Sequence, residues 1–296
     1  MALRRLKENV AKELPSKTRM LHPRVMPDVQ AEAYEHAKDK LATGTKGAAL
    51  KMLHHIRSVS VHPTITAIEG ADEFIALSGR LKACFEIMDD IHAGRERVLV
   101  FIEHIQMQYR FIELLKMRYG LRHIDLINGS TPVHKRQDIV NRFQRHLERD
   151  GGFDVLVLSP KAAGTGLTLT AATHVIHLSR WWNPAVEEQC NDRVHRIGQT
   201  KEVTIHIPMA IHHDFREKSF DCLLHSLMTR KRKLASSALW PMGDTDTDAE
   251  QLQRMLTEDV RIVDSGDPIH SAIVRTFERD QSLIPEQRAD KSYRYE

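Results

Sequence analysis

The sequence predicts an α/β fold, in which a doubly wound, mostly parallel sheet is flanked by helices. Short apolar runs rich in β-branched residues alternate with helical stretches from residue 97 to residue 208. That alternation is typical of βαβ units, whose parallel strands are buried on both faces. Glycine, hydroxyl and cationic residues follow several of these runs. Because ligands bind in loops at the carboxyl ends of parallel strands, we expect the functional residues there.

The first 92 residues are predicted to be largely helical. Asp28 is a suitable N-cap for one helix, Pro63 ends a second, and a third is expected from about Ser78 to Ala93. Strands and helices then alternate. The five expected strands are residues 97–102, 122–127, 153–158, 174–178 and 203–208. Further helices are expected between the first two strands, ending at Gly120, from Pro132 to Leu147, and over 215–235.

These elements divide the chain into four predicted parts. A helical segment covers 1–92, and the α/β unit covers 93–210. A C-terminal helical brace is expected within 211–239, because its leucines and Phe220 lie at helical spacing. The stretch 242–250 is acidic and polar, so residues 240–296 are expected to form a linker and a partly disordered tail.

Composition and charge are those of an ordinary globular protein. The formal net charge is +3, so any nucleic-acid site would have to be a local basic face. Cys84, Cys190 and Cys222 lie far apart, which fits a reducing cytosol and gives no zinc framework. No apolar run approaches about 20 residues, so no membrane span is expected. The 18 histidines match no metal-binding spacing. We therefore predict a cytoplasmic protein without a metal site.

The first candidate site is the sequence INGST at 127–131, directly after a predicted strand. Gly129 allows a tight turn, and Ser130 and Thr131 precede the helix that Pro132 opens. Free N–H groups at a helix N-terminus can bind a phosphate oxygen. The alternative is an ordinary capped turn between a strand and a helix.

The second candidate site is LSPKAAGTGLTLT at 158–170, again after a strand. Lys161 is a cation beside small residues, and Gly164, Thr165 and Gly166 form a turn that a ligand can approach closely. A tight loop with incidental hydroxyl groups is the alternative. The segment is not a Walker A loop, because no Gly-Lys-Ser/Thr follows at the required spacing.

The third candidate site is SRWWNPAVEEQCNDRVHRIGQT at 179–200. Asn183 and Pro184 predict a helix start, and the helix is expected to continue toward His195 and to end at Gly198. Arg193 and Arg196 would then share one face, with Gln189 one turn earlier.

Two interpretations of these arginines remain open. A surface network of salt bridges, with Glu188 and Asp192 as partners, is the ordinary one. In the other, the arginines lie at the carboxyl end of a strand, beside the two candidate phosphate loops. There they would neutralise the charge that develops on a transferring phosphoryl group.

The 296 residues contain no GxxxxGK[ST] motif and no acidic Mg²⁺ motif after a strand. The sequence MDDIH at 88–92 looks like such a motif, but we interpret it as the end of a helix. The chain therefore has groups that stabilise transferring charge and lacks those that hold ATP and its metal.

Over residues 3–239 the sequence resembles the second RecA-like lobe of Swi/Snf-type ATPases, the DNA-translocating branch of superfamily-two helicases. RVLVFIEH resembles motif IV, SPKAAGTGLTLTAATHVIHLSRWWNP resembles motif V with its extension, and EEQCNDRVHRIGQTKEV resembles motif VI. The ending SFDCLLHSLMTRKRKLASSAL is similar to that of simpler bacterial members. The resemblance implies a RecA-like fold and a DNA-associated, cytoplasmic protein.

The resemblance also implies roles for the candidate residues. Arg193 and Arg196 match arginine fingers that reach ATP held by the other lobe, and Gln189 matches a coupling residue at that interface. Gly164, Gly166 and Asp192 are expected near the nucleotide. Double-stranded DNA is expected to contact four residues, namely Gly129, Ser130, Lys161 and Thr165. ATP would be shared with a first lobe in cis or in trans, and Mg²⁺ would be bound only through that lobe.

The chain departs from the family's pattern at two places. Ala163-Gly164 stands where the family usually has two glycines, and Glu103-His104 stands where it often has Gln-Phe. Glu103 would add negative charge near DNA. Because Met1 falls at the junction between lobes, a fragment, a split gene and a mis-started frame are all open. The predicted function is the C-terminal half of an ATP-driven DNA translocase; the alternative is a non-catalytic module that binds DNA or a protein partner.

Overall fold

The computed structural model describes the chain in eight parts. These are residues 14–43, 49–64, 70–145, 152–162, 166–237 and 245–257, with Ile273 and the short strand Tyr293–Tyr295. The N-terminal stretch expected to be helix-like (residues 1–13) lies outside them, as do Ala163, Gly164, Thr165 and most of the predicted tail.

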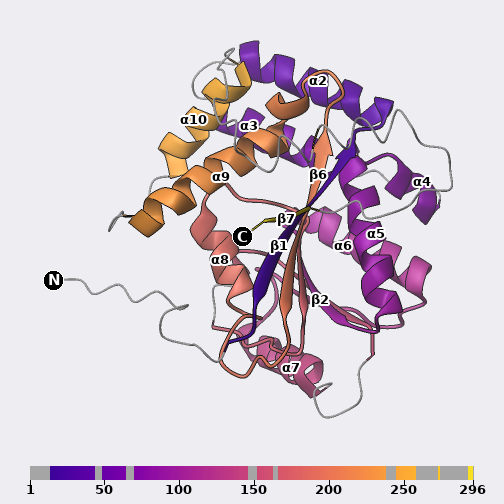
Figure 1. Cartoon of the computed structure of the whole chain (residues 1–296). Helices are drawn as coiled ribbons and strands as arrows, with labels where there is room; N and C mark the ends of the chain where they lie inside the picture. The colour runs from indigo at the N-terminus through magenta and orange to yellow at the C-terminus, as the bar shows by residue number, and fades with distance from the viewer. Residues whose placement is uncertain are drawn as a thin grey trace.

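One sheet of seven strands runs through the centre of the molecule, in the order β3-β4-β2-β5-β6-β1-β7 (Figure 1). Every neighbouring pair from β3 to β1 is parallel, and β7 is antiparallel to β1. The predicted α/β class with a mostly parallel sheet is therefore confirmed. The strands are β1 (Lys17–Val25), β2 (Arg97–Phe101), β3 (Asp125–Ile127), β4 (Asp154–Leu158), β5 (His174–His177), β6 (Val203–Ile211) and β7 (Tyr293–Tyr295).

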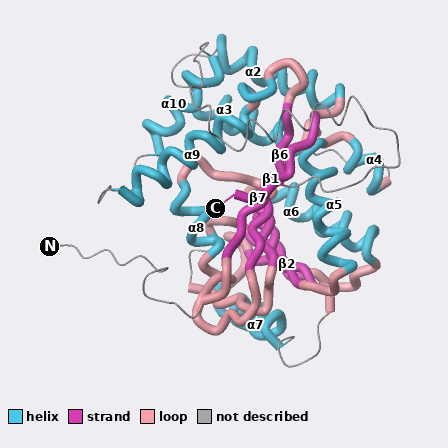
Figure 2. Tube along the Cα trace, in the orientation of Figure 1, coloured by secondary structure: helices cyan, strands magenta, loops and turns pink. Residues whose placement is uncertain are grey.

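The alternation of side chains along the central strands explains why helices cover both faces of the sheet (Figure 2). Val98 and Val100 of β2 pack into a core with α4 (Ala71–Ala76), α5 (Gly79–Ala93) and α6 (Ile105–Tyr119). Leu99 and Phe101 face the opposite core, which includes α7 (Val133–Gln144) and the end of α8 (Pro184–Asn191). Successive strand residues point to opposite faces, so a strand buried on both sides must be continuously apolar.

The prediction that residues 1–92 are helical is wrong for β1. Lys17–Val25 pairs with β6 in parallel along its whole length, so the boundary predicted after residue 92 does not separate this segment from the sheet. The strand is mixed in polarity because it lies near the sheet's edge, and more than half of its residues are only partly buried. Pro23 is tolerated because β7 pairs only with Arg19, Met20 and Leu21.

The start of α5 shows how closely this segment joins the rest. Ser78 caps the helix by accepting a hydrogen bond from Leu81 N, as predicted for a helix from Ser78 to Ala93. Gly79 follows, and a Cβ there would lie only 2.7 Å from the carbonyl oxygen of Val25 at the end of β1. The absence of a side chain lets the helix begin against the strand. MDDIH lies at the end of this helix, as expected.

A cluster of helices lies beside the far end of β6, at the upper left of Figure 1. It contains α2 (Asp28–Thr43), α3 (Ala49–Val61), α9 (Phe220–Ser237) and α10 (Thr245–Thr257), and a 3₁₀ turn at Arg216–Lys218 precedes α9. The helical brace expected within 211–239 is thus present as α9. The linker predicted at 242–250 is wrong from Thr245 onward, because Ala249, Leu252 and Leu256 repeat at helical spacing and are buried in this cluster.

Candidate functional site

The candidate residues lie at opposite edges of the sheet. We call the residues that follow β2, β3, β4 and β5 the carboxyl edge, namely 102–104, 128–131, 159–162 and 178–179. We call the residues that precede β1, β5 and β6 the amino edge, namely 15–16, 169–173 and 192–202. Ser130 and Lys161 are at the carboxyl edge, whereas Arg193 and Arg196 are at the amino edge.

The turn after β3 is held by a buried amide pair. Asn128 Nδ2 donates to Gln108 Oε1 at 3.0 Å, and Gln108 Nε2 donates to the carbonyl of Ile102 after β2 at 2.7 Å. The backbone N–H and the hydroxyl of Ser130 both donate to Asn128 Oδ1. Gly129 is exposed, and a Cβ at this position would meet no atom within 4 Å. The turn therefore presents Gly129 and Ser130 to solvent on a rigid base.

Lys161, after β4, lies at the same edge. Its side chain is exposed, and Nζ lies 5.2 Å from the centre of the Trp181 ring. Of the predicted turn that follows, Gly164 and Thr165 are outside the described residues. Gly166 is exposed with a φ of +70°, which favours glycine. Gly129, Ser130 and Lys161 thus share the carboxyl edge.

The helix before the arginines is shorter than predicted. Asn183 caps α8 by accepting from Ala185 N at 2.9 Å, and Pro184 is the first helical residue, both as expected. The helix ends at Asn191, however, and Arg193 and Arg196 lie in the turns that follow. Since the two arginines are not on one continuous helix, the expected shared face with Gln189, which lies on α8, is wrong.

The arginines also lie at the opposite edge from the one predicted. A crossover helix runs back against its strands, so the residues after α8 return to the amino ends of the sheet. Leu169 N donates to Arg193 O at 2.8 Å, His195 Nε2 bonds Pro15 O at 2.8 Å, and Val203 N donates to Ser16 O. These bonds fix the arginine segment beside the starts of β1, β5 and β6.

Arg193 and Arg196 differ in burial. Arg193 is 9% exposed, and its Nε is buried without a hydrogen-bond partner among the described residues. Burial lowers the pKa of Arg193, and the nearby charge of Arg196 acts in the same direction. Arg196 is exposed. In the described part of the chain, neither guanidinium group has an ion pair, although the charge of Asp192 acts on Arg193 and raises its pKa against the effect of burial. Arg196 is therefore the cation that is open to an anionic ligand.

The carboxylates expected as salt-bridge partners do not pair with these arginines. Glu188 pairs with Lys17 at 3.3 Å, with Arg19 and with Arg232 at 3.3 Å. Despite burial, these cations lower the pKa of Glu188 to about 2. Asp192 forms no ion pair with Arg193 or Arg196 among the described residues; its charge raises the pKa of Arg193, but less than burial lowers it. This arrangement disfavours a surface salt-bridge network as the reason for the two arginines.

The chain is similar to known helicase domains in sequence and in fold. Residues 80–198 match the family model of the helicase conserved C-terminal domain. The putative ATP-dependent helicase/translocase YwqA of Bacillus subtilis is 35% identical over 266 residues, which is 86% of this chain and 28% of that protein. The Zorya protein ZorD of Escherichia coli is 32% identical over 259 residues, covering 82% of this chain and 23% of ZorD.

Two solved structures share the fold. The Sulfolobus solfataricus SWI2/SNF2 ATPase core in complex with dsDNA superposes with a TM-score of 0.63 and 23% identity, over 86% of this chain and 53% of that chain. The C-terminal part of the Fun30 ATPase domain gives a TM-score of 0.61 and 19% identity, over 83% of this chain and 98% of that one. The chain is a C-terminal RecA-like lobe of the Swi2/Snf2 type. It spans about a quarter of the curated relatives that it matches.

In this Swi2/Snf2 lobe, sequence reasoning missed the glutamines that hold the amino edge together. Gln199 is 6% exposed, and its Nε2 donates to the carbonyls of Thr170 and Ala172 at 3.1 and 2.9 Å. Gln144 of α7 binds the same segment through Ala171 N and Thr170 Oγ1. Glutamine has no spacing signal of its own, so only the fold reveals these contacts.

One group of side chains in the described part of the lobe could hold a metal ion. Ligand atoms of His212, His213 and Asp214 lie within 4.8 Å of one another. Both ring nitrogens of His212 are already used, since Nε2 is 3.1 Å from Glu35 Oε1 and Nδ1 accepts from the loop amides of Asp214 and Phe215. No described helix of the lobe is long and apolar enough to cross a membrane.

Proposed function

We propose that this lobe is the C-terminal half of an ATP-dependent double-stranded DNA translocase, and that Arg193 and Arg196 complete an ATP site whose other half belongs to a first lobe. The observation that carries the proposal is the pair of cations at the amino edge that form no ion pair among the described residues. A buried guanidinium whose Nε lacks a hydrogen-bond partner, as in Arg193, is costly unless an anion compensates it. The phosphates of ATP are an anion of suitable charge.

The first lobe would hold ATP and Mg²⁺, and the bound nucleotide would supply the phosphoryl group that is transferred to water. The residues of this chain would contribute only by stabilising the negative charge on the phosphates. Arg196, which is exposed, would reach the phosphates when the lobes close. Arg193 would support it from its buried position. Preorganised cations that meet developing charge lower the barrier to phosphoryl transfer.

The proposed DNA surface is the carboxyl edge, with Gly129, Ser130 and Lys161. Lys161 offers an exposed cation, Gly129 lets the DNA backbone approach closely, and Ser130 would have to exchange its bonds to Asn128 Oδ1 for a phosphate oxygen. Such groups suit the DNA backbone rather than base edges. Binding would then depend strongly on salt and little on sequence. The Sulfolobus solfataricus core that shares this fold is in complex with double-stranded DNA, which supports the same ligand for the present chain.

The segment between Lys161 and Thr173 would couple the two edges. It leaves β4 at the carboxyl edge and reaches the amino edge at Leu169, where it binds Arg193 O. Gln199 and Gln144 fix its far end. A displacement of Lys161 by DNA would therefore be transmitted to the arginine segment through one short stretch of chain.

Reconstitution tests the proposal directly. A first lobe of a Swi2/Snf2 ATPase is supplied, fused or as a separate chain, and DNA affinity and DNA-stimulated ATP hydrolysis are measured on the same preparations. Arg196→Ala is expected to leave DNA affinity nearly unchanged and to reduce turnover by about 10³-fold, the scale of a lost arginine finger. Lys201→Ala, an exposed cation in the same loop, is the matched control and should retain normal turnover.

Two results would contradict the proposal. Normal hydrolysis by Arg196→Ala with loss of DNA binding would make the arginine a DNA clamp. ATP turnover by the pure 296-residue chain alone, lost on Arg196→Ala, would mean that the chain holds nucleotide without a first lobe.

A further inference from the structure

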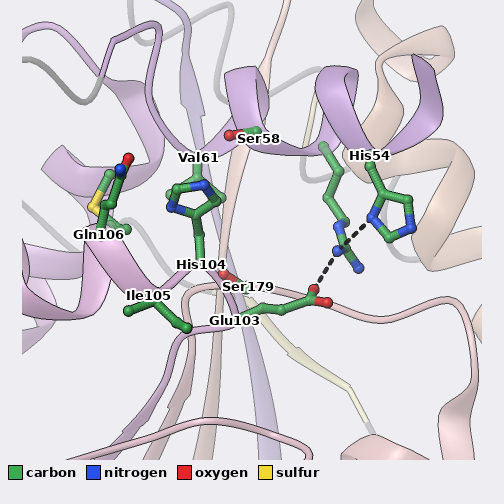
Figure 3. A pocket seen from close by; sticks show the side chains of 10 residues that line it. His54, Ser58, Val61, Glu103, His104, Ile105, Gln106 and Ser179 are labelled. Carbon is green, nitrogen blue, oxygen red and sulfur yellow. Dashed lines mark hydrogen bonds and ion pairs between the residues drawn. The ribbon is translucent and has the colours of Figure 1, made fainter. Parts of the chain in front are cut away.

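A cavity of about 610 Å³ lies between α3 and the carboxyl edge. Its wall is formed by one face of α3, by the residues after β2 that begin α6, and by Ser179 after β5 (Figure 3). Most of its titratable side chains are cations or histidines. The lining residues are His54, Arg57, Ser58, Val61, Glu103, His104, Ile105, Gln106, Met107 and Ser179.

Glu103 is the single carboxylate among these lining residues. Figure 3 shows its side chain extending toward the helix that carries His54 and Ser58, where it forms an ion pair with Arg57. Lys161 is close enough to lower the pKa of Glu103 by its charge. Glu103 therefore pairs with Arg57 of α3, and a second cation lies nearby: Lys161 Nζ is 5.2 Å from the centre of the Trp181 ring, which Arg57 also contacts.

Arg57 is held rigidly in this position. The residue is 7% exposed, and its guanidinium lies 4.5 Å from the centre of the Trp181 ring and 5.0 Å from that of Trp182. It donates to His54 Nδ1 at 3.0 Å and to the carbonyl of Arg180 at 3.4 Å. The contacts with two indole rings restrict the movement of the Arg57 guanidinium toward solvent. An anion that binds Arg57 must therefore enter the cavity.

The Glu103 carboxylate is only partly compensated at this site. Burial raises its pKa, although Arg57 and Lys161 act in the opposite direction. A phosphate diester oxygen carries the same unit of negative charge and accepts the same hydrogen bonds from a guanidinium. The pair of cations would therefore accept either anion.

We propose that Glu103 occupies the position of a DNA phosphate between Arg57 and Lys161, so that it competes with DNA and weakens the lobe's grip. The inference rests on the proposed function, in which the carboxyl edge binds DNA. When the duplex binds, a backbone phosphate replaces the carboxylate on Arg57 and Lys161. Glu103 then sets the affinity of the lobe and keeps it from binding DNA too tightly to be released.

The test is the DNA affinity of Glu103→Gln, measured for the intact chain with a fluorescent duplex at three salt concentrations. Glutamine keeps the side chain's size and can still accept a bond from Arg57. Removing the competing charge is expected to tighten binding by about tenfold and to steepen the salt dependence by about one released counterion. Glu113→Gln is the matched control, because Glu113 is 59% exposed on α6 and pairs with Arg110 away from the cavity. It should change affinity by less than about twofold.

Combined variants test whether Glu103 acts through its two cations. The gain from Glu103→Gln should largely disappear when Arg57→Gln or Lys161→Gln is already present. Lys161 is exposed, so its variant should fold even where Arg57→Gln does not. Thermal unfolding of each variant checks this.

Three outcomes would overturn the inference. Parent-like or weaker binding by Glu103→Gln would show that Glu103 does not compete with DNA, while leaving DNA binding itself established. An undiminished gain in the Lys161→Gln background would mean that Glu103 acts through general charge. If neither the parent chain nor any variant bound the duplex, the proposed DNA surface would fail and this inference with it.

Discussion

The backbone N–H of Leu169 donates to the carbonyl of Arg193 across 2.8 Å. This bond joins the chain that follows Lys161 to the segment that carries Arg193 and Arg196. Leu169 is fully buried, and the arginine segment is anchored on its other side by His195 and Pro15. The two edges of the sheet are thus connected through one stretch of chain. Residues that fix this stretch should influence stability and turnover together.

Gln199→Ala tests the effect on stability. The buried amide of Gln199 donates to three carbonyls and its Oε1 accepts from Thr200 N and Lys201 N, so alanine leaves several groups unsatisfied. The free energy of unfolding should fall by about 2–3 kcal/mol, measured by urea denaturation. Gln137→Ala removes one exposed contact on α7 and should change it by less than about 0.5 kcal/mol. Equal stability of the two variants would mean that Gln199 does not hold the segment.

Asp221→Ala should be among the most destabilising single substitutions. Arg80 and Asp221 form an ion pair with both side chains fully buried, and Asp221 Oδ2 also accepts from Ala210 N at 2.7 Å. Removing the acid leaves the Arg80 cation buried and uncompensated. A loss of about 3–5 kcal/mol is expected from denaturant unfolding. Asp72→Ala is the control, because Asp72 pairs with Arg118 but is 88% exposed; a comparable loss there would contradict the argument from burial.

Acid should destabilise the lobe in two stages. Burial, together with neighbouring His22 and His174, lowers the pKa of His206 well below 6.5, and burial also lowers the pKa of His177. Below about pH 6.5 the unfolded chain binds protons that these folded imidazoles do not, so stability falls as pH falls, by up to about 1.4 kcal/mol per pH unit for each such histidine. Glu188, with a pKa of about 2, adds a second loss below about pH 4.5, where its unfolded carboxyl begins to bind a proton.

His206→Gln isolates one contribution to the first stage. His206 lies in a chain of hydrogen bonds: its Nδ1 is 3.0 Å from His22 Nε2, and its Nε2 is 2.9 Å from His174 Nδ1. His174 Nε2 in turn lies 2.7 Å from Glu96 Oε2. The variant should be less stable at about pH 7.5 but lose less stability between about pH 7.5 and about pH 5.5. His134→Gln, at an exposed position on α7, should keep the parent's slope. Parallel slopes for the parent and His206→Gln would exclude His206 as a source of the acid sensitivity.

The sequence predicts the central strands and the start of α8, because those signals are local. Val98 to Phe101 form an unbroken apolar run, and Asn183 followed by Pro184 marks a helix start without reference to the rest of the fold. The strand β1 escapes prediction because a strand near the edge needs no continuous apolar run. The apolar spacing that predicts α10 is difficult to recognise because the helix begins with acidic residues, although Leu252 and Leu256 lie at helical spacing and are buried.

The site is only partly predictable, because its geometry depends on contacts distant in sequence. Residue types single out Arg193, Arg196 and Lys161 as candidates, but they do not place the two arginines at the correct edge. The edge follows instead from the direction of the crossover: α8 runs back along the sheet from the end of β5, so the residues after it lie at the amino ends of the strands. The ion pair between Glu103 and Arg57 joins two segments that no local pattern connects.

The final prediction separates the two arginines by stability. Arg193 is 9% exposed, its Nε has no hydrogen-bond partner among the described residues, and burial lowers its pKa. In the isolated chain its charge is therefore a cost that the charge of Asp192 offsets only in part. Arg193→Met, which keeps the length of the side chain and removes the charge, should therefore raise the free energy of unfolding by about 1 kcal/mol. Arg196→Met should leave it within about 0.5 kcal/mol, because that side chain is exposed. With a first lobe present, both variants should lose turnover. A loss of more than about 2 kcal/mol for Arg193→Met would instead make Arg193 a structural residue of the amino edge, and would leave Arg196 as the one arginine poised for ATP.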